Sequence, residues 1–488
     1  MSRIAAFLEC IPGSRGVHIG LIAFMGLLLA IGNWPWHLDN YDQAKQAYVA
    51  QEITKSGELW FQHTPQGRSA SKPPLMGWIS AGLKAAGIPW DIALRLPSIL
   101  CALALLAILL QEGKTLLGVS GATLAAAAFG FNLMTPHLAT LVRTDMMLSF
   151  FIFLIGWMIY RKLRSGVEWT TAERWGVFWC MMAALFAKGP VLYAFLLPGL
   201  IIFAIMERGR SHAKLVWPGW WPWLIPLGFF LWWGIAGLVT NRDFYNDVVV
   251  REFLSRFHEG ARKDERPQPI WFYFPHLLHQ FAPWSLLLLG IAICFPEVRR
   301  RIREKPHILW LVLWSVGGLL FMTIVPAKRV DRIYPVIPPF CLLLVEWCAM
   351  LWGDRRVRIA AGASLVAGVL FAGCYFIGLV PLGYHDRIDA LVNFSQQASR
   401  VAASHGVDHI TLPRSRDEGL LFYFDRPAFD DKSEALEIWK AGKPCALVLS
   451  EGDAKQFFAK VGHPVEPVLD SGKLIGKNER EYYLFLQD

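Results

Sequence analysis

Long apolar runs separated by short polar segments fill the first 380 residues of the chain. A helix needs roughly 17–25 apolar residues to cross a bilayer, and runs of about this length recur. They predict membrane spans at about 17–33, 89–110, 116–134, 144–160, 171–187, 190–206, 220–240, 277–296, 306–325, 331–350 and 357–380. The shorter apolar segments 73–87 and 135–143 could be half-spans or helices in the interface, and the expected count rises from 11 to 13 if both cross. The run at 17–33 follows Arg3 and Arg15 without a clear cleavage site, which predicts a retained signal-anchor helix.

The pattern changes after residue 380, where charge rises and the apolar runs shorten to strand length. Alternation of strand-length and helix-period segments predicts a small α/β domain at 381–488, after a membrane domain at 1–380. The expected strands are 409–412, 420–424, 445–450 and 482–486, and the expected helices are 387–404, 433–441 and 453–461.

Composition agrees with a polytopic α-helical membrane protein. The chain is 54% hydrophobic and 18% charged, with a mean hydropathy of +0.36. Many of its 22 Trp lie at the ends of apolar runs, as in 217–233, where an interfacial aromatic belt is expected. The eight Cys are scattered without a C-x-x-C pair and are interpreted as packing residues. The net charge of +9 resides mostly in loops, so nucleic acid is not an expected partner.

Basic clusters predict the orientation of the chain. They occur near the N-terminus and at 161–166, 207–214, 297–305 and 353–358, all on one side of the predicted spans. Because basic loops stay in the cytoplasm, the N-terminus is expected there. The amphipathic loop 34–88, the loop 241–276 and the C-terminal domain are then expected on the periplasmic face of a bacterial inner membrane.

Polar residues, most of them charged, also gather on the face opposite these clusters. A charge near the bilayer is costly, so it tends to be paired or functional. Cations beside carboxylates suit a polyprenyl phosphate whose tail lies in lipid, with a carboxylate taking a proton from an attacking hydroxyl. The residues concerned are Asp39, Asp42, Lys72, Arg143, Asp145, Lys188, Arg256, Lys328, Arg329, Asp331, Arg332 and Tyr334.

Each of these residues has a structural alternative. Asp39 and Asp42 could cap a helix that starts near residue 43. Lys72 could be an interfacial lysine, and Arg143 could simply pair with Asp145. Lys188 and the segment 328–334 could be solvated loop charges. His276 and His279 share a helical face but have no spaced acid or Cys partner, so a metal site there is not expected.

Six stretches, in order, resemble the C-type (GT-C) glycosyltransferases, in particular lipid A aminoarabinose transferases and related protein O-mannosyltransferases. The resemblance covers about residues 17–350 and implies a membrane glycosyltransferase that uses a polyprenyl-phosphate sugar. The matching stretches are "YDQAKQAYVAQEITKSGELW", with Asp42 at the family's Asp; "SKPPL", with Lys72; Asp145 at the head of a span; Lys188-Gly189; "FLSRFHEG … APWS", with Arg256; and "KRVDRIYPVIPP".

The resemblance assigns roles to the charged face. Asp42 and Asp145 are the expected catalytic carboxylates, with Asp39, Arg143 and Tyr334 as auxiliary residues. The donor phosphate is expected to bind Lys72, Arg256, Lys188, Lys328 and Arg332.

Three positions depart from the family pattern, and two of them bear on a metal. Gln43 replaces a Glu, Ser71 replaces another Glu, and Phe253 stands where the family often has His. The last two replacements remove groups that could have served a metal. No metal site or other cofactor is therefore assigned, and a divalent metal stays an alternative.

The expected activity is transfer of a sugar, aminoarabinose or another pentose or hexose, from undecaprenyl or another polyprenyl phosphate. Lipid A or another cell-envelope molecule is the expected acceptor. A protein O-mannosyltransferase would use the same donor chemistry. A transporter or flippase of lipid-linked sugars would more often show internal repeats and midplane polar residues, and neither is seen here. A receptor-like scaffold with an outer binding domain is the remaining alternative.

Overall fold

A computed structural model describes residues 8–10, 15–31, 38, 41–64, 68–210, 212–241, 243–254, 268–375, 377, 386–407, 409–413, 418–472 and 481–487. The chain divides into two compact units. The first contains residues 1–32, 71–76 and 95–373, and the second contains 33–70, 77–94 and 374–488.

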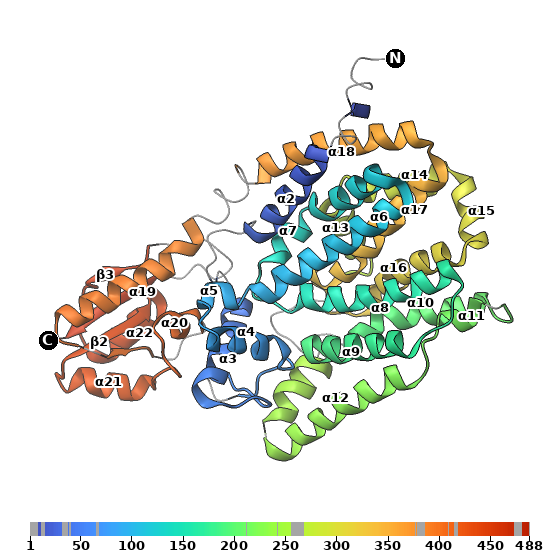
Figure 1. Cartoon of the computed structure of the whole chain (residues 1–488). Helices are drawn as coiled ribbons and strands as arrows, with labels where there is room; N and C mark the ends of the chain where they lie inside the picture. The colour runs from blue at the N-terminus through green and yellow to red at the C-terminus, as the bar shows by residue number, and fades with distance from the viewer. Residues whose placement is uncertain are drawn as a thin grey trace. The chain divides into compact units, whose positions relative to one another are not determined.

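The first unit is helical (Figure 1). Its elements are α2 (Arg15–Ile31), α6 (Leu96–Gly130), α7 (Met134–Ala139), α8 (Asp145–Ser165), α9 (Thr171–Lys188), α10 (Leu192–Met206), α11 (His212–Leu215), α12 (Trp221–Thr240), the π-helix η2 (Tyr245–Phe253), α13 (Tyr273–Gln280), α14 (Trp284–Cys294), α15 (Pro296–Glu304), α16 (Pro306–Ile324), the 3₁₀ helix η4 (Val330–Val336), α17 (Ile337–Leu351) and α18 (Asp354–Cys374).

Several of these helices can cross a membrane, which confirms the polytopic helical class. Within the described part of the chain, six are long and apolar enough: α6, α8, α12, α16, η4 with α17, and α18. The pair α13 and α14, bent by 111°, adds a seventh if it forms one span. Shorter apolar helices occupy Ile19–Ala30 and Leu192–Met206. The count of 11 to 13 spans stays a prediction.

Helix α6 is a hairpin rather than one straight rod. The backbone leaves helical geometry at Leu117 and Gly118, where Gly118 has a φ of +62°. A Cβ on Gly113 would lie 2.4 Å from the carbonyl oxygen of Gly121. Residues eight apart in a straight helix are about 12 Å apart along the axis, so the two arms must fold back on each other. This turn separates the two spans expected at 89–110 and 116–134.

Small residues let α10 and α16 pack closely. A Cβ on Gly317 would lie 3.0 Å from the Gly199 nitrogen, and one on Gly199 would lie 2.9 Å from the Trp314 Cα. Helix pairs in membranes gain stability from this kind of close backbone approach, because lipid supplies no hydrophobic driving force between them. The crossing fixes the α10 wall of the groove described below.

The second unit combines the segment after the first helix with the C-terminal sheet. Its elements are α3 (Tyr41–Ser56), most of α4 (Leu75–Ala85), α5 (Trp90–Ala93), α19 (Asp386–Ser404), β1 (Ile410–Thr411), α20 (Glu418–Tyr423), α21 (Lys432–Lys440), β2 (Cys445–Ser450), α22 (Glu451–Val461), β3 (Leu469–Asp470) and β4 (Tyr482–Gln487).

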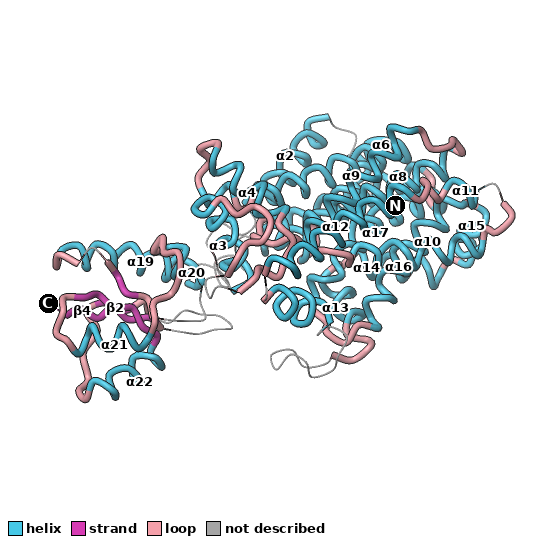
Figure 2. The backbone as a smooth tube through the Cα atoms, turned by 90° about the horizontal axis from the view of Figure 1, so that it is seen from below, coloured by secondary structure: helices cyan, strands magenta, loops and turns pink. Residues whose placement is uncertain are grey.

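The sheet has the strand order β1-β2-β4-β3, with β1 parallel to β2 and the other pairs antiparallel. Figure 2 shows α19 on one side of the strands and α21 and α22 on the other. Alternate residues of β2 point to opposite faces, so Ala446 and Val448 join one core while Leu447 and Leu449 join the other. The small α/β C-terminal region is therefore confirmed.

One expected strand is wrong, because residues 420–424 begin inside helix α20. A five-residue apolar run fits a buried helix as well as a strand, and packing decides between them. Leu420 and Leu421 are fully buried in the same core as Tyr48 of α3. The run therefore forms a helix that packs against another helix. The short strand β3 was not predicted.

Helix α3 is bound to the C-terminal part of its unit by polar contacts as well. The Gln51 amide donates a hydrogen bond of 2.7 Å to Asp425, and the Lys55 Nζ lies 2.8 Å from the same carboxylate. The Tyr48 hydroxyl donates to the carbonyl of Pro427. The helix that carries Asp42 is thus held by the α/β region.

Candidate active site

Asp145 is the first residue of α8, and its carboxylate lies buried between two cations. Lys188, the last residue of α9, forms an ion pair with Asp145 Oδ1. Arg143 Nε lies 3.3 Å from the other oxygen, Oδ2. Lys72 is also near enough to interact electrostatically with this carboxylate. Burial makes such a pairing necessary, because an isolated charge would be costly there.

The loop before α8 is held by a hydrogen bond from the neighbouring helix. Ser98, near the start of α6, lies 3.2 Å from the carbonyl oxygens of both Leu141 and Arg143. The hydroxyl is itself completely buried. This contact positions the backbone that carries Arg143 and Asp145.

The ion pairs continue to the 3₁₀ helix η4. Arg143 Nη2 contacts Asp331 Oδ2, and Arg329 Nε lies 3.3 Å from Asp331 Oδ1. The result is an alternating row of cations and carboxylates, Lys188–Asp145–Arg143–Asp331–Arg329. With three cations and two carboxylates, the row carries one excess positive charge.

A large groove opens beside this row in the first unit. Its volume is about 960 Å³, and most of its lining is apolar. Among the described residues, the charged side chains of the lining are Lys72, Lys188 and Arg332, and no Asp or Glu joins them there. Such a groove suits a ligand with an anionic head and a long apolar tail.

The apolar walls come mainly from α10, α12 and α16, and the π-helix η2 adds Val248 and Val249. The α10 wall is one helical face that covers more than two turns, formed by Tyr193, Ala194, Leu197, Pro198, Ile201 and Ile202. Residues from the second half of α12 and the end of α16 form the other walls: Phe230, Leu231, Trp233, Gly234, Ile235, Leu238, Phe321 and Met322. From Tyr193 to Ile202 the α10 face extends about 13 Å.

Two further predicted residues lie outside the groove lining. Lys328 is buried, and its Nζ donates a hydrogen bond of 3.1 Å to the carbonyl of Gln268. Burial lowers the pKa of Lys328. Tyr334 is fully buried and lies 3.1 Å from the Thr135 hydroxyl. Lys328 thus connects its loop to the segment at Gln268, and Tyr334 connects η4 to α7.

The remaining predicted residues belong to other parts of the chain. Asp42 occupies the first turn of α3 in the second unit, followed by a buried Gln43. Ser71, at the position of the family's Glu, lines the groove next to Lys72. Asp39 and Arg256 lie outside the described residues.

Sequence reasoning missed His137 of α7 and the buried Asn132 that precedes it. His137 lies close enough to interact electrostatically with Arg143 and Asp331 of the ion-pair row. Asn132 accepts hydrogen bonds from the backbone nitrogens of Met134 and Thr135, at 3.0 and 2.9 Å. Each is a single polar residue in an apolar stretch, and the sequence pattern therefore did not predict its contacts.

The helices and the groove define a polytopic membrane protein, and solved structures share its fold. The crystal structure of ArnT from Cupriavidus metallidurans bound to undecaprenyl phosphate superposes with a TM-score of 0.72 at 17% identity. That match covers 96% of this chain and 98% of the other. An oligosaccharyltransferase from Archaeoglobus fulgidus superposes with a TM-score of 0.50 at 11% identity, over 90% of this chain and 69% of the other.

Sequence relatives narrow the resemblance to aminoarabinose transferases. The undecaprenyl phosphate-alpha-4-amino-4-deoxy-L-arabinose arabinosyl transferase of Pseudomonas savastanoi pv. phaseolicola is 27% identical over 70% of this chain and 62% of its own length. The enzyme of the same name from Yersinia pestis is 32% identical over 29% of this chain and 25% of its own length. The chain thus spans less than two thirds of these relatives. No protein-family model matches it.

Proposed function

We propose that the protein transfers a sugar from a polyprenyl-phosphate donor to lipid A or another envelope acceptor on the periplasmic face of the inner membrane. The observation that carries this proposal is the apolar groove with Lys72, Lys188 and Arg332 in its lining. The relative of the same fold from Cupriavidus metallidurans was crystallised with undecaprenyl phosphate, which is a ligand of this chemistry.

Donor binding would divide between the two parts of the groove. The phosphate would lie among the three cations, and Arg332 can contact two of its oxygens at once. The first isoprene units would lie along α10 and α12. Lipid is as apolar as the groove, so the walls would contribute mainly shape and packing.

The transfer step needs a base and a stabilised leaving group. We assign Asp42 as the carboxylate that accepts the proton of the acceptor hydroxyl while its oxygen attacks the anomeric carbon. The bond from that carbon to the phosphate oxygen breaks, and the cations stabilise the released phosphate. The proposal assigns no residues to a metal, since Ser71 and Phe253 replace the family's Glu and His.

Replacement of Lys72 tests the phosphate site. Lys72→Ala should weaken binding of undecaprenyl phosphate by about 10- to 150-fold, because a hydrogen bond to a charged group contributes about 1.5–3 kcal/mol. The measurement is the Kd of the purified protein in nanodiscs. Lys84→Ala is the matched control, a lysine of the following helix α4 that is absent from the groove lining. An unchanged Kd for Lys72→Ala would remove Lys72 from the phosphate site.

A second variant tests the apolar wall. Gly234 lines the groove, and a Cβ there would meet no heavy atom within 4 Å, so Gly234→Trp should fold and fill the groove. We expect the affinity for undecaprenyl phosphate to fall at least about tenfold, or about 1.4 kcal/mol. Gly228→Trp, on the same helix with the same open space but outside the lining, should bind normally. Equal Kd values for the two variants would place the tail elsewhere.

The proposal includes a cytoplasmic N-terminus and a periplasmic C-terminal unit, based on the basic loops. Reporter fusions at about 165, 302 and 355 should report the cytoplasm, and a fusion after 404 should report the periplasm. A cytoplasmic signal from the fusion after 404 would reverse the orientation.

A further inference from the structure

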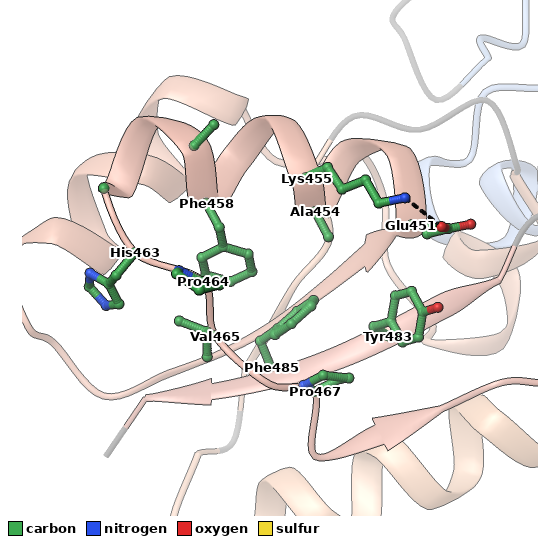
Figure 3. Close-up of a pocket in the computed structure, with 12 residues that line it drawn as sticks. Glu451, Ala454, Lys455, Phe458, His463, Pro464, Val465, Pro467, Tyr483 and Phe485 are labelled. Atoms are coloured by element: carbon green, nitrogen blue, oxygen red, sulfur yellow. Dashed lines mark hydrogen bonds and ion pairs between the residues drawn. The ribbon is translucent and has the colours of Figure 1, made fainter.

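A second groove lies in the C-terminal region, entirely within the second unit. Its volume is about 600 Å³, and it runs between α22, the loop that follows it, and strand β4. Figure 3 shows its side chains. The lining consists of Glu451, Ala454, Lys455, Phe458, Ala459, Gly462, His463, Pro464, Val465, Pro467, Tyr483 and Phe485.

The floor of this groove is aromatic. Tyr483 and Phe485 are two apart in β4, so they share one face of the sheet. The rings of Phe458 and Phe485 are 4.7 Å apart, which fixes the Phe485 ring against α22. The rings of Tyr483 and Phe485 are 6.2 Å apart, and Tyr483 remains half-buried at the open side.

The wall opposite the strand is a short loop with restricted backbone. Helix α22 ends at Gly462, which has a φ of +102°. Pro464 and Pro467 follow within five residues and fix their own φ angles. A wall of this kind loses little conformational entropy when a ligand binds, which favours recognition by a shallow site.

The rim supplies hydrogen-bond donors and acceptors. Lys455 Nζ lies 2.7 Å from the Glu451 carboxylate, and both side chains are more than half exposed. Burial and a hydrogen bond to the Glu481 side chain raise the pKa of Tyr483 to about 12. His463 is exposed at the far end.

We propose that this groove binds one saccharide ring of a glycan acceptor. A pyranose ring has an apolar face of C–H groups and an equatorial edge of hydroxyls. The aromatic floor would contact the C–H face. The Glu451 carboxylate would accept hydrogen bonds from the hydroxyls, and the Lys455 ammonium would donate to them. The inference rests on the proposed function, since it names the class of acceptor.

The groove is distant from the helix that carries Asp42. Helix α3 packs through Tyr48 into the core on the other face of the sheet, together with α20. Phe458 and Phe485 belong to the opposite core. A sheet and its covering layer are about 10 Å apart, so the bound ring cannot be the one that reacts. The groove therefore holds a remote part of an oligosaccharide acceptor.

Binding of chitotetraose to the full-length chain in nanodiscs tests this inference. Saturation-transfer NMR should detect a contact with a Kd on the order of 1 mM, as expected for a shallow site. Tyr483→Ala should weaken it at least about fivefold, and Tyr483→Phe should keep most of it because the ring face remains. Glu451→Gln should weaken it, whereas Glu434→Gln, in the first turn of the neighbouring α21, should not.

Separate control experiments test whether the variants still fold and still bind the donor. Lys455→Glu changes a side chain that is 76% exposed, so it should fold normally and still weaken binding. All variants should bind undecaprenyl phosphate with the native Kd. Absence of chitotetraose binding at about 10 mM, or equal binding by every variant, would overturn the inference. If the native protein also fails to bind undecaprenyl phosphate, the proposed function itself is wrong.

Discussion

Asp42→Asn is expected to reduce sugar transfer by about 10²–10⁴-fold while the protein stays folded and still binds its donor. Asparagine keeps the shape of the side chain but cannot accept the proton of an attacking hydroxyl. Asp42 lies in the first turn of α3, where its charge favours the helix dipole. The dipole contribution of that charge is about 0.3–1 kcal/mol, and the measured thermal stability separates any effect on folding from loss of the base.

The assay is transfer from a polyprenyl-phosphate sugar by purified protein, with donor Kd and thermal stability measured on the same preparation. Asp354→Asn is the matched control, because Asp354 occupies the first turn of α18 in the same way and has no proposed role. A folded Asp42→Asn protein with near-normal turnover would exclude Asp42 as the base. Asp145 would then be the next carboxylate to test.

Hydrophobic patterning was sufficient for most of the fold. Runs such as 144–160 and 306–325 match α8 and α16, because a helix in lipid must be both long and apolar. The C-terminal strands 445–450 and 482–486 were also found by their length and composition. The prediction of a strand at 420–424 was wrong, because this segment packs against α3, more than 350 residues earlier in the chain. No local signal contains that contact.

The site was predictable as a set of charges but not as a set of pairs. Arg143, Asp145 and Lys188 stood out because charges at span ends are costly. That Arg143 would also bind Asp331, 188 residues later, follows only from the packing of α8 against η4. His137 and Ser98 gave no signal, since a single polar residue in an apolar run is usually a satisfied core residue. Ser98 contributes by positioning the backbone that carries Arg143 and Asp145.

The shape of the groove could not be predicted from the sequence alone. Its lining comes from segments as far apart as Lys72 and Arg332, and besides its three predicted cations only two features of it are visible in the sequence. One is the face of α10, which repeats at intervals of three and four residues from Tyr193 to Ile202. The other is the glycine pair that lets α10 approach α16. Volume and shape depend on the arrangement of helices, which periodicity does not specify.

Asp145→Asn is expected to destabilise the first unit by about 3–5 kcal/mol, because it removes one partner of a buried ion pair. Lys188 loses its partner carboxylate in this variant, while Arg143 retains Asp331. Both cations then face an uncharged amide in a buried site. The measurement is the unfolding free energy in mixed micelles.

A double variant tests whether the cost of Asp145→Asn arises from the unpaired charge of Lys188. Lys188→Met removes the stranded cation, so Asp145→Asn with Lys188→Met should be more stable than Asp145→Asn alone, and the two effects should be non-additive. Glu297→Gln is the surface control: Glu297 also contacts two arginines, at 2.6 and 2.9 Å, but in an exposed helix, and its replacement should leave stability nearly unchanged. Strict additivity of the Asp145 and Lys188 variants would mean that their ion pair does not stabilise the fold. The cost of Asp145→Asn would then belong to the other contacts of that carboxylate, foremost the one with Arg143.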